Sequence, residues 1–68
     1  MNIQELENIV EQVIIENPRI VGIQHIGAKQ TKINYIAGQV MRRTENTVNL
    51  NITKHIIQEK LRLWRNLK

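Results

Sequence analysis

The sequence predicts an all-α fold, a small bundle of three to four helices. Apolar residues recur at the helical spacing i, i+3, i+4 in three separate segments, and such a stripe is typical of a helix that buries one face. Asn2, Asn17-Pro18 and Asn49 precede helical segments, where asparagine can cap a helix and proline suits its first turn. With 68 residues, the chain is expected to form one domain over residues 1–68.

The first two predicted helices meet at Asn17-Pro18. Asn2 is the expected N-cap of the first helix, whose buried stripe contains Ile3, Leu6, Val10, Val13 and Ile14. Asn17 is expected to cap a short second helix, with Pro18 at its first position and Gly27 as its C-cap. The apolar side of this second helix consists of Ile20, Val21, Ile23 and Ile26.

The third predicted helix runs from about Lys29 to Arg43 and contains a glycine. Its apolar stripe is formed by Ile33, Ile36, Ala37, Val40 and Met41. Gly38 lies within this helix, where glycine costs about 1 kcal/mol relative to alanine. Close approach by another backbone, or by a ligand, is the usual reason for such a glycine. We therefore expect Gly38→Leu to destabilise the domain more than a surface substitution does.

A polar loop over residues 44–49 is expected to lead into the fourth helix, which Asn49 or Asn51 caps. One side of this helix is expected to carry Ile52, Ile56, Leu63, Trp64 and Leu67. Trp64 is expected to pack between the first and fourth helices. If it is buried, truncation to alanine costs about 3–5 kcal/mol.

The charges are unevenly distributed along the chain. The net charge is +4, but residues 1–17 carry four glutamates and no base, whereas the remaining residues carry all ten bases and two acids. A basic segment of this kind suggests a polyanionic partner such as nucleic acid. The alternative is a solvated surface with charges that compensate the helix dipoles.

Basic and polar side chains form two predicted stripes that suit a phosphate backbone and are expected to share one outer surface. On the third helix, Lys32, Gln39 and Arg43 lie together, with Tyr35 and Arg42 beside them. On the fourth helix, the stripe is Lys54, Gln58, Arg62 and Arg65. Lys29 could hold a phosphate at the start of the third helix, or be solvated. The predicted nucleic-acid-binding set is Lys29, Lys32, Gln39, Arg42, Arg43, Lys54, Arg62 and Arg65; the alternative is an ordinary exposed helix face.

The sequence offers little for catalysis or metal binding. It contains no cysteine and no Gly-rich phosphate loop, and its two histidines, His25 and His55, do not have metal-ligand spacing. We expect no catalytic residue and no metal site. No apolar run approaches the roughly 20 residues that span a bilayer, and the acidic start is unlike a signal or transit peptide. A cytoplasmic location, or an organelle matrix after processing, is expected.

Residues 36–44 read Ile-Ala-Gly-Gln-Val-Met-Arg-Arg-Thr. This segment resembles the Gly-Gln-Val-Met-Lys-x-Thr signature of the C-terminal tail (YqeY-like) domain in the B subunit of aspartyl/glutamyl-tRNA(Asn/Gln) amidotransferase. The resemblance covers residues 6–61. Upstream it includes Glu16-Asn17-Pro18, Val21, Gly27 and Lys29, and downstream Thr44, Asn49, Ile52, Ile56, Ile57, Glu59, Lys60 and Leu61. An extra residue near Ala28, Asn46 in place of a usual glycine and Leu50 in place of a usual proline put the loop geometry in question.

The resemblance implies a non-catalytic tail that binds the outer corner of tRNA. The parent enzyme would amidate Glu-tRNA(Gln), and often Asp-tRNA(Asn), with ATP, Mg²⁺ and glutamine, whereas the tail would need no cofactor. The implied partners are tRNA, the remaining domains of the B subunit, and the A and C subunits of the amidotransferase, with no membrane. Structural roles are expected for Pro18, Gly27, Gly38, Met41 and Trp64.

Two alternatives stay open at this point. The same domain type could be free-standing or appended to a glutaminyl-tRNA synthetase as a YqeY-like RNA-binding domain. The chain could instead be a helical protein-docking module without an RNA role, using the acidic first helix or an apolar groove.

Overall fold

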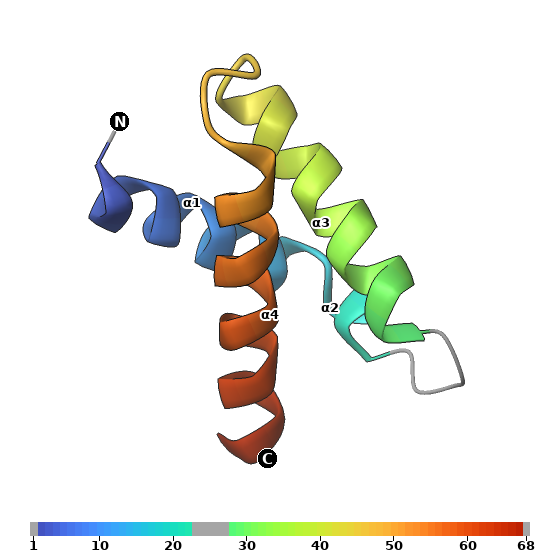
Figure 1. Ribbon diagram of the computed structural model, residues 1–68. Helices are drawn as coiled ribbons and strands as arrows, with labels where there is room; N and C mark the ends of the chain where they lie inside the picture. Colours follow the sequence, from blue (N-terminus) through green and yellow to red (C-terminus); the bar gives the residue numbers. More distant parts are fainter. Residues whose placement is uncertain (1, 23–27, 68) are drawn as a thin grey trace.

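Four helices make up most of the part of the chain that the structure describes (Figure 1). The computed structural model describes the backbone of residues 2–22 and 28–67, and the side chains of residues 2–22 and 29–63. The helices are α1 (Ile3–Glu16), α2 (Pro18–Val21), α3 (Ala28–Arg43) and α4 (Leu50–Leu67). No strand occurs within these residues, so the predicted all-α fold is confirmed.

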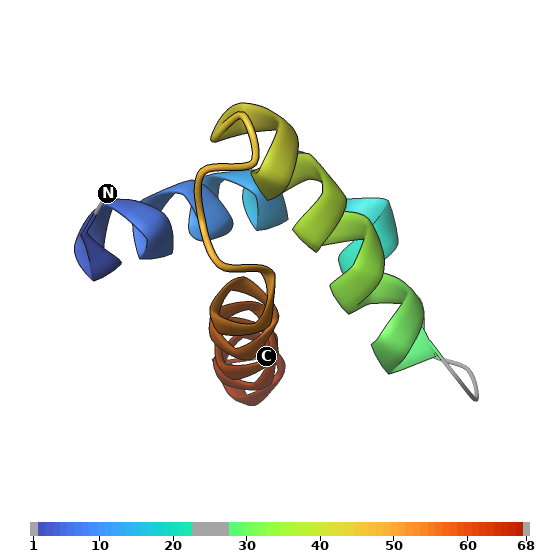
Figure 2. The same cartoon turned by 45° about the horizontal axis from the view of Figure 1, so that its top comes forward.

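The three long helices pack against one another in pairs, and α2 packs against α1 and α3. In Figure 1, α1 runs from the left of the view to behind α4, and α3 lies to the right of α4. In Figure 2, where α4 is seen nearly end-on, α1 and α3 form an arch over it. The core therefore lies where α1 crosses the two later helices.

Aliphatic side chains fill this core. Its buried members are Leu6, Val10, Val13, Ile14, Ile33, Ile36, Ala37, Val40 and Ile57. The predicted stripes of α1 and α3 are thus confirmed except at two positions. Met41 is only partly buried, and Ile3 is 55% exposed because the first turn of α1 projects beyond the other helices (Figure 1).

The buried side of α4 is displaced around the helix from the predicted apolar side. Ile57 and Thr53 are fully buried, whereas Ile52 is 47% and Leu63 is 54% exposed. The contact face of α4 must meet both α1 and α3, and it is centred on Ile57 rather than on the predicted stripe. The buried Thr53 hydroxyl donates a hydrogen bond to the Asn49 carbonyl at 2.8 Å, so no polar group is left unpaired there. The side chains of Trp64 and Leu67 lie outside the described residues, and their packing stays a prediction.

Asparagine side chains close three helix ends. The Asn2 side chain accepts a hydrogen bond from the Glu5 N–H at 2.8 Å, and Asn49 accepts one from the Ile52 N–H at 3.0 Å, so both predicted caps are confirmed. Asn17 stands at the N-cap position of α2, but its side chain instead donates to the Val13 carbonyl at 2.8 Å. It therefore closes the end of α1 rather than the start of α2.

The short helix α2 has Pro18 near its start, as predicted, but it ends at Val21 with Gly22 at its C-cap position. It is thus shorter than expected. The predicted C-cap, Gly27, and the apolar positions Ile23 and Ile26 lie outside the described residues.

The α3 helix ends in a Schellman-type turn, which tolerates the unusual asparagine of this chain. The Asn46 N–H donates to the Met41 carbonyl at 2.9 Å, and the Glu45 N–H donates to the Arg42 carbonyl at 3.2 Å. Glu45 has φ 54° and Asn46 has φ 59°, both left-handed. Asparagine adopts this region more readily than most residues, so Asn46 can replace the usual glycine.

The threonine of the signature has a structural role at the same turn. Thr44 is only 5% exposed, and its hydroxyl donates to the Val40 carbonyl at 2.9 Å. Its own carbonyl accepts from the Thr47 hydroxyl at 2.5 Å. Thr44 therefore satisfies buried polar groups where α3 ends.

Gly38 does not lie against another part of the described chain. It is exposed, and a Cβ built on it would meet no heavy atom within 4 Å beyond the adjoining backbone of its own helix. On the helix, Gly38 lies roughly opposite the buried Ile36 and Val40. The expected contact with a neighbouring backbone is wrong, and the expected destabilisation by Gly38→Leu loses its physical reason.

We expect Gly38→Ala to raise the free energy of unfolding by about 1 kcal/mol, because alanine has a higher helix propensity and the added methyl group meets open space. Urea denaturation followed by circular dichroism measures this change. A loss of stability would contradict the exposed position of Gly38.

We expect Glu45→Gly to raise the free energy of unfolding by up to about 1 kcal/mol, because a left-handed conformation strains a glutamate but not a glycine. Thermal unfolding provides the measurement. Asn46→Gly is the matched control and should have a smaller effect, since asparagine tolerates this conformation. Equal effects at both positions would count against this account.

Candidate nucleic-acid interface

Helix α3 carries four cations and no acidic residue: Lys29, Lys32, Arg42 and Arg43. Lys29 and Arg42 are exposed, whereas Lys32 and Gln39 are partly buried. One exposed strip, which we call the outer face of α3, consists of Thr31, Tyr35, Gly38 and Arg42. These residues share a face because Tyr35, Gly38 and Arg42 follow Thr31 by about one, two and three helical turns. Lys32, Gln39 and Arg43 lie on one flank of it, as the helical wheel predicts.

Acidic residues of α1 neutralise part of the basic charge on the later helices. Arg43 donates a hydrogen bond to the Glu16 carboxylate, and the Lys60 ammonium lies 3.5 Å from the Glu11 carboxylate. Exposed pairs of this kind contribute little to stability, because water screens them well. Within the described residues, no ion pair involves Lys29, Lys32, Arg42 or Lys54.

The contact with Arg43 changes the acidity of the Glu16 carboxyl group. The hydrogen bond from Arg43, and a second one from the Gln12 amide at 3.1 Å, lower the pKa of Glu16 below its ordinary value of 4.5, while desolvation opposes them. Glu16 is therefore ionised at neutral pH and holds the Arg43 guanidinium. A phosphate group would have to compete with Glu16 for Arg43, but not for Arg42.

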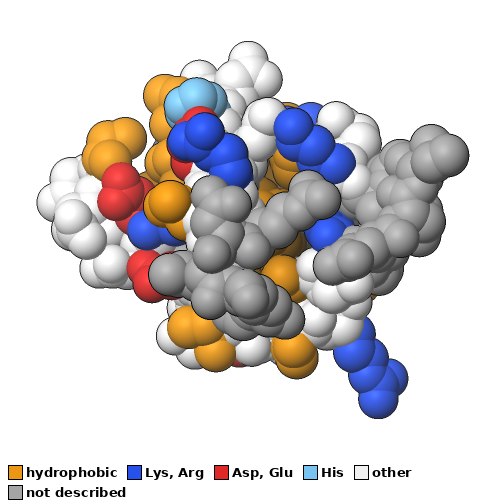
Figure 3. Space-filling view, turned by 90° about the horizontal axis from the view of Figure 1, so that it is seen from below, with side chains coloured by type: hydrophobic (Ala, Val, Ile, Leu, Met, Phe, Trp, Pro, Cys, Tyr) orange, Lys and Arg blue, Asp and Glu red, His pale blue; other side chains and the backbone are white. Residues whose placement is uncertain are grey.

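The predicted cations of α4 differ from one another in exposure and in ion pairing. Lys54 is partly buried, and Arg62 is exposed but pairs with Glu59 at 2.7 Å. The side chain of Arg65 lies outside the described residues. Figure 3 shows one face of the molecule on which Lys and Arg side chains are spread out, with hydrophobic side chains between them. Whether these cations share one surface with those of α3 therefore stays a prediction.

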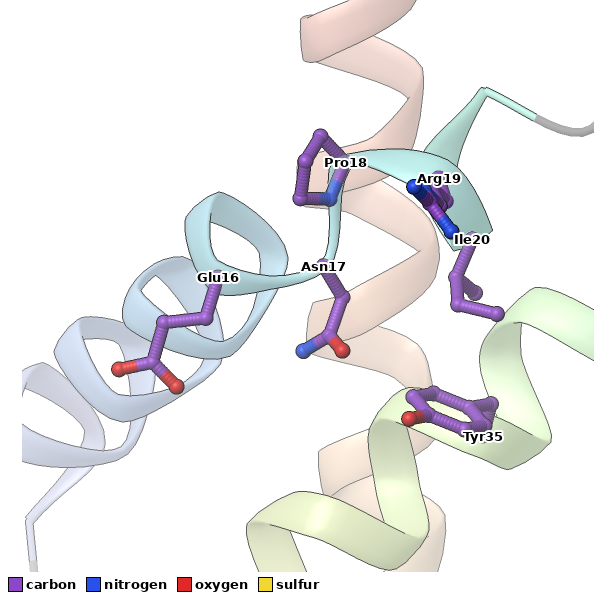
Figure 4. Close-up of a pocket in the computed structure, with 6 residues that line it drawn as sticks. All are labelled: Glu16, Asn17, Pro18, Arg19, Ile20 and Tyr35. Atoms are coloured by element: carbon purple, nitrogen blue, oxygen red, sulfur yellow. The ribbon is translucent and has the colours of Figure 1, made fainter.

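A shallow pocket of about 350 Å³ lies where α1, α2 and α3 meet. It is lined by Glu16, Asn17, Pro18, Arg19, Ile20 and Tyr35. In Figure 4 the Tyr35 ring lies on the α3 side of the pocket and faces the Asn17–Ile20 segment. The one carboxylate in the lining, Glu16, is already bound by Arg43 and Gln12. The pocket thus brings together no free acid–base pair.

Arg19 is a cation outside the predicted nucleic-acid-binding set. It is exposed at the pocket edge, and among the described residues it has no ion pair. It follows Pro18 in a helix of four residues. Such a helix is too short for a stripe to identify its outer face, so the sequence held no signal beyond the charge itself.

The described residues offer no group of three His, Cys, Asp or Glu side chains that could hold a metal ion. In the same part of the chain, no helix has the length and apolar character needed to cross a membrane.

This arrangement defines a small helical domain in which one long, cation-rich helix is exposed along its outer face. Comparison with known proteins identifies the family. The family model GatB_Yqey, described as the GatB domain, matches residues 1–61. The chain belongs to this family.

The similar curated proteins are all much longer than this chain. It is 39% identical over 56 residues to the B subunit of the aspartyl/glutamyl-tRNA(Asn/Gln) amidotransferase of Methanopyrus kandleri, covering 82% of the chain and 12% of that protein. It is 35% identical over 60 residues to the protein of the same name from Thermoanaerobacter sp., covering 88% and 12%.

A plant protein is also similar. It is the chloroplastic/mitochondrial B subunit of the glutamyl-tRNA(Gln) amidotransferase of Ricinus communis, 36% identical over 58 residues that cover 84% of the chain and 10% of that protein. The chain thus spans about one-tenth of the length of each relative. No solved structure matches the chain.

The Glu16–Arg43 pair predicts a pH dependence of stability. Because the folded state lowers the Glu16 pKa below 4.5, the pair's contribution is complete above this value and is lost as the pH falls through the lower, folded pKa. We therefore expect Glu16→Gln to reduce the loss of stability on acidification. Thermal unfolding between about pH 3 and 6 measures it. Arg43→Gln should give the same flattening, and an unchanged pH profile in both variants would contradict the pairing.

Proposed function

We propose that this chain is a non-catalytic tRNA-binding domain from the B subunit of an aspartyl/glutamyl-tRNA amidotransferase, and that it recruits tRNA through its outer corner for transamidation. Membership in the GatB_Yqey family supports the link to this enzyme. The observation that carries the binding role is the charge of α3, which has four cations, no acid and an exposed Arg42 without an ion pair among the described residues.

The physical basis is phosphate binding by a helix face. Helix α3 has 16 residues and is therefore about 24 Å long, enough to follow several phosphates. Lysine and arginine displace the counterions of the nucleic acid, and polar groups such as Gln39 can hydrogen-bond to phosphate or ribose. Folded RNA is recognised largely by shape, through phosphates and 2′-hydroxyls, and a rigid basic helix suits that mode.

The remaining parts of the proposal concern the parent enzyme. The relatives are named as amidotransferase subunits, and the chain spans about 12% of the first of them. We place the ATP-, Mg²⁺- and glutamine-dependent chemistry in the rest of the enzyme, with the other domains of the B subunit and the A and C subunits as partners. A cytoplasmic site of action, or an organelle matrix as in the plant relative's name, is part of the same proposal.

A protein-docking role is the second candidate, and α4 provides the observation that favours it. Ile52 is 47% and Leu63 is 54% exposed, and with the partly buried Ile56 they lie on one edge of this helix. An exposed apolar edge can bind another protein surface. In that case Leu63→Ser would abolish assembly with the other subunits, while substitutions of the cations would change nothing.

Fluorescence anisotropy of a labelled tRNA(Gln) transcript tests the proposed function directly. We expect the 68-residue chain to bind it with an affinity that falls steeply between about 50 and 300 mM salt. Affinity that does not depend on salt would contradict a phosphate-based interface.

Two substitutions that each remove one charge should change tRNA affinity in opposite directions. Arg42→Gln removes a cation without an ion pair, so the affinity should fall severalfold and the salt slope should decrease by about one. Glu16→Gln releases Arg43 from its partner and should strengthen binding.

Glu5→Gln is the control for Glu16→Gln, because Glu5 is an exposed glutamate in the first turn of α1, far along the chain from Arg43. It removes the same charge without releasing a cation. If Glu5→Gln and Glu16→Gln strengthened binding equally, net charge rather than the Arg43 contact would be responsible. Unchanged affinity in Arg42→Gln would exclude α3 from the interface.

A further inference from the structure

Gly38 occupies a position where no contact within the described chain requires a glycine. It lies in the second half of α3 and is exposed, and beyond the adjoining backbone of its own helix no heavy atom lies within 4 Å of the place where a Cβ would be. Glycine weakens a helix at such a position. No contact within the described residues offsets this loss of helix stability. A binding partner is therefore the remaining reason for a glycine here.

The neighbours of Gly38 on the outer face of α3 are suited to an anionic partner. One turn before it lies Tyr35, which is 42% exposed, and one turn after it lies Arg42, which is exposed and has no ion pair among the described residues. Because Gly38 has no side chain, the helix backbone is uncovered between these two residues, and we call this gap the notch. The ring can pack on a ribose, and the guanidinium can bind a phosphate through two parallel hydrogen bonds.

We propose that the sugar–phosphate backbone of the bound tRNA comes closest to the protein at Gly38, resting in the notch between Tyr35 and Arg42. This inference rests on the proposed function and assigns the contact point within it. The glycine is needed because any side chain there would hold the RNA backbone away from α3. The distance between the phosphate and the Arg42 guanidinium would then increase.

A nucleic acid fits this notch better than a protein helix does. Glycines also allow two helices to approach closely, but such a contact requires apolar neighbours. Around Gly38 the exposed residues are polar or basic: Thr31, Asn34, Tyr35 and Arg42. The strongly exposed aliphatic side chains lie on α1 and α4 instead, among them Ile15 and Leu63. Charge complementarity therefore selects a polyanion as the occupant.

The test compares Gly38→Ala and Gly38→Leu with wild type in the tRNA(Gln) anisotropy assay. Both variants are expected to remain folded, with the melting temperature of Gly38→Ala raised, because the added atoms meet open space. We expect Gly38→Ala to bind tRNA severalfold more weakly and Gly38→Leu about tenfold or more weakly. Higher stability combined with weaker binding is the signature of a residue kept for a partner.

Asn8→Ala and Asn8→Leu are the matched controls. Asn8 is an exposed helical residue on the acidic α1, so the same two residues are introduced into a helix away from the proposed interface. These variants are expected to bind tRNA as the wild type does. An equal loss of affinity in both series would overturn the inference.

A proximity measurement covers the case in which Gly38→Leu fails to fold. The chain contains no cysteine, so a hydroxyl-radical probe can be attached to a single cysteine at Asn34→Cys, beside the notch, or at Asn8→Cys as the control. The inference expects strong cleavage of the tRNA backbone from the probe at position 34 and weak cleavage from position 8. Equal cleavage from both positions would overturn it.

The outcomes separate this inference from the function on which it rests. If Arg42→Gln weakens binding but both Gly38 variants bind like the wild type, the contact point is wrong and the proposed function stands. If the wild type itself does not bind tRNA, the proposed function and the contact point are both wrong. If Gly38→Leu keeps its tRNA affinity but loses assembly with the other amidotransferase subunits, the notch holds a protein and the inference is overturned.

Discussion

The burial of one face of α1 beneath both α3 and α4 is the interaction on which the rest of the structure depends. Val10 and Val13 of α1, Ile36 of α3 and Ile57 of α4 are all completely buried. Each such side chain contributes about 1.5–3 kcal/mol when buried, a large part of the roughly 5–15 kcal/mol total stability that is typical of small domains. The chain has no phenylalanine and no cysteine, so branched aliphatic side chains carry much of this contribution. The same crossing brings Glu16 and Glu11 of α1 to Arg43 and Lys60 of the later helices.

The sequence predicted those parts of the fold that depend on local signals. Helical spacing identified the buried faces of α1 and α3, and Asn2 and Asn49 identified two helix starts, because capping involves only residues within one turn. The predicted apolar side of α4 did not identify its buried face, which is centred on Ile57, because the position of that face depends on where α1 and α3 lie. For the candidate site, spacing placed Arg42 and Arg43 on α3, but it could not show that Glu16 pairs with Arg43 and that Arg42 has no ion pair among the described residues. That contact joins residues far apart in the sequence.

The signature segment combines two kinds of residue that the sequence could not separate. Val40 and Thr44 face inward, one filling the core and the other closing the end of α3. Gly38 and Arg42 face outward and have no contact that explains them within the described chain. A short stretch of one helix thus both anchors the domain and presents its outer face. Because the inward residues fix the rotation of α3 about its axis, they also fix the direction in which Gly38 and Arg42 point.

The acidic character of α1 has a consequence for how the molecule meets a charged partner in solution. Four glutamates lie in the first seventeen residues and all ten bases follow them, and the first turn of α1, which carries Glu5, lies on the far side of the molecule from α3 (Figure 1). The domain therefore has an electric dipole moment across its width. In the field of a polyanion, such a dipole exerts a torque that turns α1 away and α3 inward before contact. The glutamates of α1 thereby favour productive orientation during diffusional encounter.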